Sequence, residues 1–470
     1  MDRSLAEQQT EPIRKVPLII VLLSGAFLAI LNQTLLATAL PVIKDDLQIN
    51  DNTVQWLQSI FMLVNGIMIP ITAFLIERFT TRGLFMTAMG SFALGTIVCA
   101  IAPEFYTLLL GRVLQAAGAG IMMPLMQTIM FLIFPKEKRG TAMGLFGLII
   151  SFAPAIGPTL SGYLLEHYPW RSLFYVVSPI AIIDVIVAYF ILKNVTKQTF
   201  PKVDILSIVL SSLGFGGLLY AFSTAGNAGW TSWQVILTML LGAVTLLWFI
   251  LRQLKLEKPI LEFRIFKNPV FTMTTVLGMV VFLAMIGGAV ILPLLMQDML
   301  GFSPFESGLA LLPGAIVMGI MNPITGRLFD KYGAKWLSII GLLILTVSTF
   351  FLTVLTPETT FTYIATVHTF RMLGIAMVMM PVTTAGLNQL SPQLLPHGTA
   401  MNNTLRQVAG AIGTAMLVTV MTTTAIPKEG LSGYIHGVDM AFAVAGIIAA
   451  VGLVITFFTK YDQTSVAKEN

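Results

Sequence analysis

Ionisable and amide side chains stand inside several of the long apolar stretches of this sequence. Arg112 and Gln115 share one stretch, and Asp184 is the acid that the spacing places at mid-membrane depth. A charge at the centre of a bilayer costs on the order of 3 kcal/mol on insertion scales unless it faces water or a partner. A buried carboxyl suits proton binding and release, so we expect Asp184 to serve proton coupling, and we expect Arg112 to face a cavity. A structural hydrogen bond is the alternative for each.

Further polar groups in the apolar stretches indicate a solute-binding cavity. They would be costly facing lipid, so we expect them to face the interior, although hydrogen bonding between helices is a rival explanation. Methionine adapts to varied apolar ligands, although plain packing is its commoner role. The residues expected to line or shape the cavity are Asn32, Gln33, Arg112, Gln115, Met123, Arg371, Asn402 and Arg406.

One phrase of the sequence occurs twice in the same direction. Residues 67–79, IMIPITAFLIERF, return at 320–332 as IMNPITGRLFDKY. The run Gly-Thr-Ala-Met at 140–143 likewise returns at 398–401. Several such echoes in the same order indicate a duplicated unit whose two copies run the same way along the chain.

The repeated phrase ends in an acid-base pair, which predicts a gate. A short charged turn between membrane helices places an acid beside the N-terminal end of a neighbouring helix, where the dipole and a nearby arginine attract it. Such a clasp forms in one conformation and breaks in another; a plain topology signal is the alternative. The predicted gating residues are Glu77, Arg78, Arg82, Asp330 and Lys331.

The stretch 151–162 contains helix-weakening residues. Pro154 and Pro158 each remove a helical donor, and Gly157 and Gly162 permit close approach of a neighbouring backbone. We expect a helix here that bends and packs tightly, with a static kink as the alternative.

The composition is that of a membrane protein. The chain has 470 residues, of which 56% are hydrophobic and 10% are charged, whereas soluble domains carry about 25% charged residues. The apolar stretches are of helical spanning length, which predicts an all-α polytopic protein. The predicted spans are 16–40, 53–76, 83–102, 105–134, 140–165, 172–192, 203–224, 232–251, 270–297, 304–326, 336–355, 360–388, 399–424 and 437–459.

The distribution of basic residues supports fourteen spans with both termini in the cytoplasm. With that orientation, Lys44, Arg171 and Lys428 are the basic residues that fall outside, against the rule that basic loops stay in the cytoplasm. Three arginines lie within spans, so 21 of the 27 Lys and Arg, from Arg3 and Arg14 to Lys460 and Lys468, fall inside. A missed helix would invert every later loop. The net charge of +5 is therefore an orientation signal, and a nucleic-acid role is not expected.

The duplication divides the chain into four parts. We expect a six-helix bundle over 1–193, two inserted helices over 194–251, a cytoplasmic linker over 252–268, and a second six-helix bundle with a tail over 269–470. No cluster of His and Cys has metal-ligand spacing, and no phosphate-binding glycine loop is present. We therefore expect no metal, no cofactor, no use of ATP and no enzymatic activity.

These features resemble the major facilitator superfamily, in particular its fourteen-helix drug:proton antiporters. The run 326–335, GRLFDKYGAK, is similar to the gating-loop pattern of that family, whereas the first copy has Glu77 for the usual Asp and Thr80 for the usual Gly. Arg112, Gln115 and Gly118 resemble the helix 4 signature linked to proton coupling. The run 155–162 resembles the helix 5 signature of exporters. The local sequence around Asn32 is similar to that of the lincosamide and multidrug exporters of Gram-positive bacteria.

The sequence departs from many of these relatives at Asn32, where they carry an Asp. Asn does not titrate, so another carboxyl must carry any coupled proton. Asp184 is our candidate, although sixth helices lie at the periphery in this fold. Glu77, Glu166 and Asp298 are alternatives nearer the membrane faces.

The resemblance implies a transporter of the bacterial plasma membrane. We expect proton-coupled efflux of amphipathic, cationic or neutral drugs by alternating access, with drugs, protons and the lipid bilayer as partners and a monomer as the working unit. Export of a lipid or lipid-like metabolite is the alternative within transport. A membrane scaffold or sensor is the alternative of another class, although a scaffold has no need of paired clasps.

Overall fold

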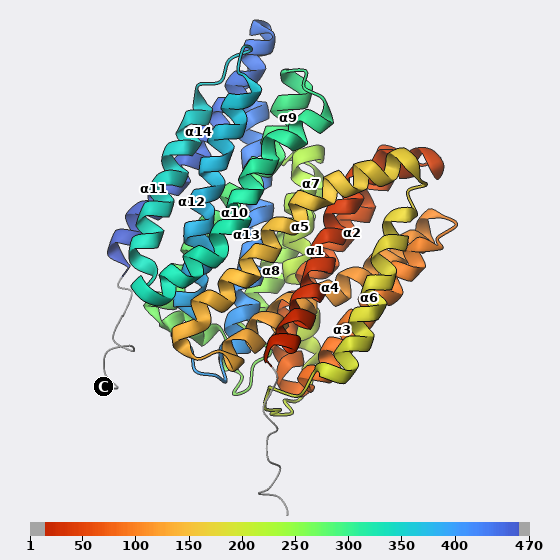
Figure 1. Cartoon of the computed structure of the whole chain (residues 1–470), viewed down its shortest axis with the longest axis vertical. Coiled ribbons are helices and arrows are strands. Elements are labelled where there is room, and N and C mark those ends of the chain that lie inside the picture. The colour runs from red at the N-terminus through yellow and green to blue at the C-terminus, as the bar shows by residue number, and fades with distance from the viewer. Residues whose placement is uncertain (1–14, 460–470) are drawn as a thin grey trace, which may run out of the picture.

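The computed structural model describes residues 15–459, and within that range fourteen helices are long and apolar enough to cross a membrane (Figure 1). The predicted number of spans is thus confirmed, and no strand occurs in the described part. The terminal residues with Arg3, Arg14, Lys460 and Lys468 lie outside it. The first half is α1 (Lys15–Asp46), α2 (Asp51–Arg78), α3 (Thr81–Ala100), α4 (Phe105–Ile133), α5 (Arg139–His167) and α6 (Ser172–Ile191).

Two inserted helices lead to the second half. The inserted pair is α7 (Ile205–Ala228) and α8 (Trp233–Lys255). The second half is α9 (Pro269–Leu294), α10 (Pro304–Tyr332), α11 (Ala334–Phe350), α12 (Phe361–Leu387), α13 (Leu395–Thr424) and α14 (Leu431–Phe458). Short helices in the connections are Lys136–Lys138, Phe263–Lys267, Leu295–Met299, Phe351–Thr353 and Pro427–Glu429.

The helices extend beyond the apolar stretches that predicted them. Helix α10 continues to Tyr332, past the predicted end at 326, and α13 begins at Leu395 rather than at 399. Hydropathy marks the part of a helix that suits lipid, whereas backbone hydrogen bonds continue through the polar turns at its ends. Glu77 and Asp330 consequently lie in the last turns of α2 and α10.

Side-chain caps and one left-handed glycine set the helix ends nearest the repeated phrases. Thr80 accepts from the Gly83 amide at 3.0 Å and begins α3. Gly333 has φ of 77°, a conformation that suits glycine and permits the tight turn from α10 into α11. The two copies of the phrase therefore end in different turns, one capped by a hydroxyl and the other made by glycine.

The two halves meet along two seams, α5 with α10 (Figure 1) and α2 with α13. The α5–α10 seam depends on glycine. A Cβ on Gly144 would lie 2.6 Å from the carbonyl oxygen of Asn322, and one on Gly140 would lie 2.5 Å from the carbonyl oxygen of Gly326. Such distances are too short for any larger side chain, so these glycines let the two backbones touch.

The inserted helices pack against the other seam, since α7 contacts both α2 and α13. Leu219 of α7 fills the space that a Cβ on Gly66 of α2 would need. Tyr220 stacks on Trp56 of α2 with ring centroids 5.8 Å apart. Trp230, in the turn before α8, donates its indole N–H to the Thr419 hydroxyl of α13 at 2.6 Å. Helix α7 thus bridges the α2–α13 seam.

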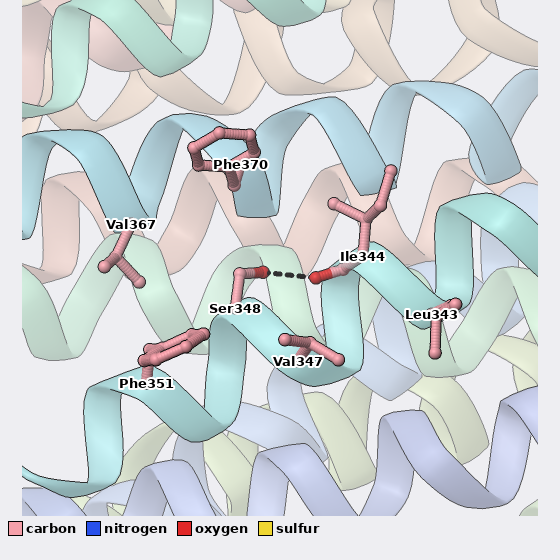
Figure 2. Close-up of a pocket in the computed structure, with 7 residues that line it drawn as sticks. All are labelled: Leu343, Ile344, Val347, Ser348, Phe351, Val367 and Phe370. Carbon is pink, nitrogen blue, oxygen red and sulfur yellow. Dashed lines mark hydrogen bonds between the residues drawn. The ribbon is translucent and has the colours of Figure 1, made fainter.

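A cavity of about 340 Å³ opens between α11 and α12 (Figure 2). Its lining is Leu343, Ile344, Val347, Ser348, Phe351, Val367 and Phe370. The Ser348 hydroxyl donates to the Ile344 carbonyl at 2.6 Å, so it is already used within α11. No residue predicted to bind solute lines this cavity, so it is separate from the candidate site.

Candidate functional site

The acid of the second repeat closes the α5–α10 seam. Asp330 accepts hydrogen bonds from the Gly140 amide at 2.7 Å, the Thr141 amide at 2.8 Å and the Thr141 hydroxyl at 2.6 Å. These amides are the unpaired donors at the start of α5, where the helix dipole also favours an anion. Asp330 is therefore held by the other half of the molecule, and we call this contact the second clasp.

The acid of the first repeat closes the α2–α13 seam in a related way. The Glu77 carboxylate lies 3.1 Å from Nε2 of His397, near the start of α13. The repeat pairs 140–141 with 398–399, so His397 occupies the position of Arg139. We call this contact the first clasp. Each clasp thus joins the end of one helix to the start of a helix in the other half.

The other predicted gating residues lie beside the clasps. Arg78 donates to the Pro201 carbonyl at 2.9 Å, and the Arg82 guanidinium lies 4.3 Å from the centre of the Tyr189 ring. Lys331 lies over the ring of its neighbour Tyr332, at 5.0 Å. None of these three bases pairs with Glu77 or Asp330 in the contacts described, so the acids reach the opposite half without them.

A polar seam continues from the clasps into the interior of the molecule. Each of its hydrogen bonds joins the first half to the second. From the clasps inward they are Arg139 to Asn388 at 2.8 Å, Thr128 to Thr399 at 2.8 Å, Asn403 to Gln127 at 2.7 Å and Asn322 to Ser151 at 2.9 Å. Ser151 is twelve residues from the start of α5, or about 18 Å along the axis. The halves are therefore fastened from one face to about mid-depth.

Both repeated phrases lie on this same face, which we call the clasp face. There Glu77 joins the end of α2 to the start of α13, Asp330 joins the end of α10 to the start of α5, and Arg139 joins the start of α5 to the end of α12. Figure 1 shows the two halves converging at this end and splaying apart toward the other. This common face is what a duplicated pair of gates requires.

Arg112 is the centre of a buried network in the first half. Its Nη1 donates to Asn32 at 2.7 Å and to Gln115 at 2.8 Å, and its Nε donates to the Leu57 carbonyl at 3.1 Å. The guanidinium lies 4.3 Å from the centre of the Phe61 ring and is fully buried. The predicted grouping of Asn32, Arg112 and Gln115 is thus present. In this conformation, however, the group joins α1, α2 and α4 by hydrogen bonds, which is what the alternative of bonding between helices predicts.

The buried arginines of the second half are separate from that network. Arg371 donates to the Ala284 carbonyl at 3.0 Å and to the Thr349 hydroxyl at 3.1 Å. Arg406 donates to the Met379 carbonyl at 3.3 Å and to Thr383. Asn402 is buried near the start of α13, whereas Gln33 and Met123 are half-buried. The residues predicted to share a cavity therefore lie in separate clusters, one set in each half.

Asp184 lies inside the first half, where α6 packs on α1 and α3. It accepts a hydrogen bond from the Ser24 hydroxyl at 2.5 Å, and its other oxygen has no hydrogen-bond partner among the described residues. Met122 and Phe85 lie beside it, around Gly25 of α1. Asp184 is thus buried with one oxygen free of hydrogen bonds, and none of the hydrogen bonds described joins it to Arg112.

The predicted helix 5 signature divides into two parts. Gly157 faces Thr34 of α1 so closely that a Cβ would collide with its hydroxyl. Gly162 faces open space, with nothing within 4 Å of a Cβ, so the prediction of close approach is wrong there. It lies a turn and a half farther along α5, on the side turned away from α1, since its neighbour Ser161 makes the contact with α1 there. Pro154 and Pro158 lie within α5, which is one helix from Arg139 to His167.

Sequence reasoning missed the partners of the clasps. His397 was not predicted as a site residue, although the repeat, whose copies are offset by 258 residues here, aligns it with the residue before Gly140. Asn322 and Ser151 were also missed as a pair, although Asn322 interrupts the repeated phrase 320–332. Glu166 and Asp298, the alternative carboxyls, are exposed at helix ends.

Comparisons with known proteins agree with this architecture. The chain is 53% identical over 97% of both chains to the uncharacterized MFS-type transporter YcnB of Bacillus subtilis. It is 42% identical to the lincomycin resistance protein LmrB of B. subtilis, over 96% of this chain and 97% of that one. The multidrug export protein EmrB of Escherichia coli is 27% identical, over 88% and 82% of the two chains.

A solved structure supports the fold. The human organic anion transporter MFSD10 superimposes with a TM-score of 0.70 at 13% identity, covering 95% of this chain and 100% of that one. The family model described as Major Facilitator Superfamily matches residues 22–414. The chain is therefore a multi-pass membrane transporter that belongs to the major facilitator superfamily.

Proposed function

We propose that this protein exports amphipathic drugs from the cytoplasm by alternating access, driven by the proton gradient. The observation that carries the proposal is the polar seam between the halves, which runs from the clasps to the contact of Ser151 with Asn322. A seam made of separate hydrogen bonds between two packed bundles can open as a unit, because each donor and acceptor finds water when the halves part.

The basic residues set the direction of transport in this proposal. The positive-inside rule places the clasp face, with the linker after α8, in the cytoplasm. The conformation described here is then sealed toward the cytoplasm, and drug uptake from that side requires both clasps and the seam to open. Export follows when the seam closes again behind the drug.

Relatives support the class of substrate. LmrB and EmrB are named for lincomycin resistance and multidrug export, and we infer a similar range of cationic or neutral amphiphiles here. Methionines that border the interior include Met122, Met126, Met379 and Met380. Their flexible, polarizable side chains suit apolar ligands of varied shape.

For the proton we propose Asp184 as the carrier. It is buried, it has one oxygen without a partner, and it lies against α1, the helix that carries Asn32. Asn32 accepts from Arg112 as an amide and does not titrate. A proton arriving at Asp184 would remove the charge next to Ser24 and so loosen the contact of α6 with α1.

The test is drug uptake into inside-out vesicles that contain the purified protein. We expect uptake to collapse with a protonophore and to survive removal of ATP; the opposite pattern would refute the mechanism. Asp184→Asn should abolish uphill uptake while drug binding persists, with Glu358→Gln as the control on an exposed acid of the α11–α12 connection. Unchanged uphill uptake by Asp184→Asn would exclude Asp184 as the required carboxyl.

A further inference from the structure

The linker between α8 and α9 is a packed element of the clasp face. Its Ile260, Leu261 and Ile265 are buried. The side-chain oxygen of Gln253, at the end of α8, accepts from the Ile260 amide at 2.8 Å. Such burial and pairing hold the linker against the ends of the neighbouring helices. A change in these contacts can therefore shift the linker.

His397 joins this linker to the first clasp. Its Nδ1 accepts from the Glu262 backbone amide at 3.3 Å, while its Nε2 lies 3.1 Å from the Glu77 carboxylate. The imidazole is almost wholly buried, with 6% of the side chain exposed. The ring of His397, which belongs to α13, therefore contacts both the linker and α2.

The partners of the ring indicate its tautomer. A backbone amide always donates, so Nδ1 must carry a lone pair, and the ring proton must be on Nε2, where it is donated to Glu77. A second proton could bind only at Nδ1. It would face the Glu262 amide, donor against donor, and that contact would be lost.

We propose that His397 is a positioning residue that holds the linker to the first clasp only while its ring is neutral. A proton from the clasp face releases the linker and turns the contact with Glu77 into an ion pair. The charged side chain in contact with the ring is Glu77 from α2, whereas Glu262 meets the ring with its backbone amide and its carboxylate accepts from Arg264. Neighbouring Arg78 is turned to Pro201. Glu77 therefore remains the anion that the charged ring would meet.

The inference goes beyond drug export, and its test measures a distance rather than transport. Spin labels are attached at Lys258→Cys on the linker and Gln393→Cys before α13, two exposed positions, in a Cys99→Ala background. Double electron–electron resonance is recorded from about pH 8 to about pH 5, the range in which histidine changes charge. We expect one narrow distance at high pH and a broad, longer distribution at low pH.

Two variants separate the roles of the ring nitrogens. His397→Asn keeps an oxygen near the position of Nδ1 but does not reach Glu77, so the linker should stay docked at every pH. His397→Gln keeps a donor near the position of Nε2 but no acceptor at Nδ1, so the linker should be released at every pH. His436→Gln, at an exposed histidine, should titrate like the parent.

Three results would overturn the proposal. They are a parent distance that does not change with pH, a His397→Gln linker that stays docked, and a His397→Asn linker that still responds to acid. Gel-filtration profiles of the labelled proteins show that each variant is folded. A failure of drug uptake with an unchanged distance response would count against the proposed function alone.

Discussion

The two clasps descend from one repeated phrase, yet they are built differently. Asp330 reaches three donors at the bare start of α5 and needs no other element. Glu77 reaches a histidine side chain, and its own backbone carbonyl also accepts from the Thr199 amide at 3.0 Å. The linker and α7 add further contacts on that side. Helix α7 and the two connecting segments thus add contacts around the first clasp, whereas the second clasp stands without them.

This difference predicts unequal motion at the two seams. The α2–α13 seam is bridged by α7 and tied to two connecting segments, whereas glycine-lined α5 and α10 touch directly. Few elements have to move when α5 and α10 part. We therefore expect the α5–α10 seam to open more widely during transport and the α2–α13 seam to behave more like a hinge.

The largest effect should come from cross-linking the two seams. In a Cys99→Ala background, a bifunctional thiol reagent joining Ser151→Cys to Asn322→Cys should reduce drug uptake more than tenfold, about 1.4 kcal/mol or more in the barrier, because it locks α5 to α10. Joining Trp230→Cys to Thr419→Cys, which fastens the inserted helices to α13 beside the other seam, should leave most uptake, because that seam is expected to act as a hinge. Equal losses would remove the distinction between the seams.

A smaller effect is expected when the clasps themselves are weakened. Asp330→Asn replaces a charged acceptor of three hydrogen bonds, each worth roughly 1.5–3 kcal/mol, whereas Glu77→Gln keeps an oxygen that can accept from the single donor on His397. We expect a severalfold greater fall in uptake for Asp330→Asn, measured with both variants at equal expression. A greater fall for Glu77→Gln would show that the reinforced clasp is the dominant gate.

The glycines of α5 give a matched pair. Gly157→Ala should destabilise the protein by about 1–3 kcal/mol, as overpacking does, because its Cβ would collide with Thr34. Gly162→Ala should have no measurable effect, because its Cβ would face open space. Thermal unfolding in detergent measures both. Loss of stability in Gly162→Ala would contradict the packing of α5 described here.

The smallest effect concerns the ion pair that fastens the inserted helices. Burial opposes the charge on Asp204, but hydrogen bonds from Arg252 and Ser207 outweigh it and lower the pKa of this carboxyl. Its contribution to stability is thus present at neutral pH and is lost as the pH falls through the lowered folded-state value. The pair is partly exposed, so Asp204→Asn should lower the Tm at pH 7 by no more than about 2 °C. The difference from the parent should vanish in acid.

The architecture was accessible from the sequence because the bilayer imposes it. Apolar length gave the fourteen helices, and the asymmetry of Lys and Arg agreed with that count. The repeat predicted that Glu77 and Asp330 would serve equivalent contacts, and both do lie at the start of a helix in the opposite half. These features depend on length, order and charge, which a sequence states directly.

The sequence did not predict which face each helix presents to its neighbours. The helices are apolar on nearly every side, so hydropathy does not say which side Arg112 or Gly162 presents to a neighbour. Arg112 points into its own half, where it donates hydrogen bonds to Asn32 and the Leu57 carbonyl. Gly162 faces open space. His397 and its linker partner depend on the packing of three separate elements, which no local pattern records.

The central claim is that the two halves pivot as bodies, so that one face closes as the other opens. Its most direct test is a pair of distances in the Cys99→Ala background. One joins Glu137→Cys to Lys335→Cys on the clasp face, and the other joins Tyr168→Cys to Ser303→Cys at the opposite end, all exposed positions. On addition of a transported drug we predict reciprocal changes, the first distance lengthening as the second shortens. Two distances that stay fixed, or that change in the same sense, would contradict the account.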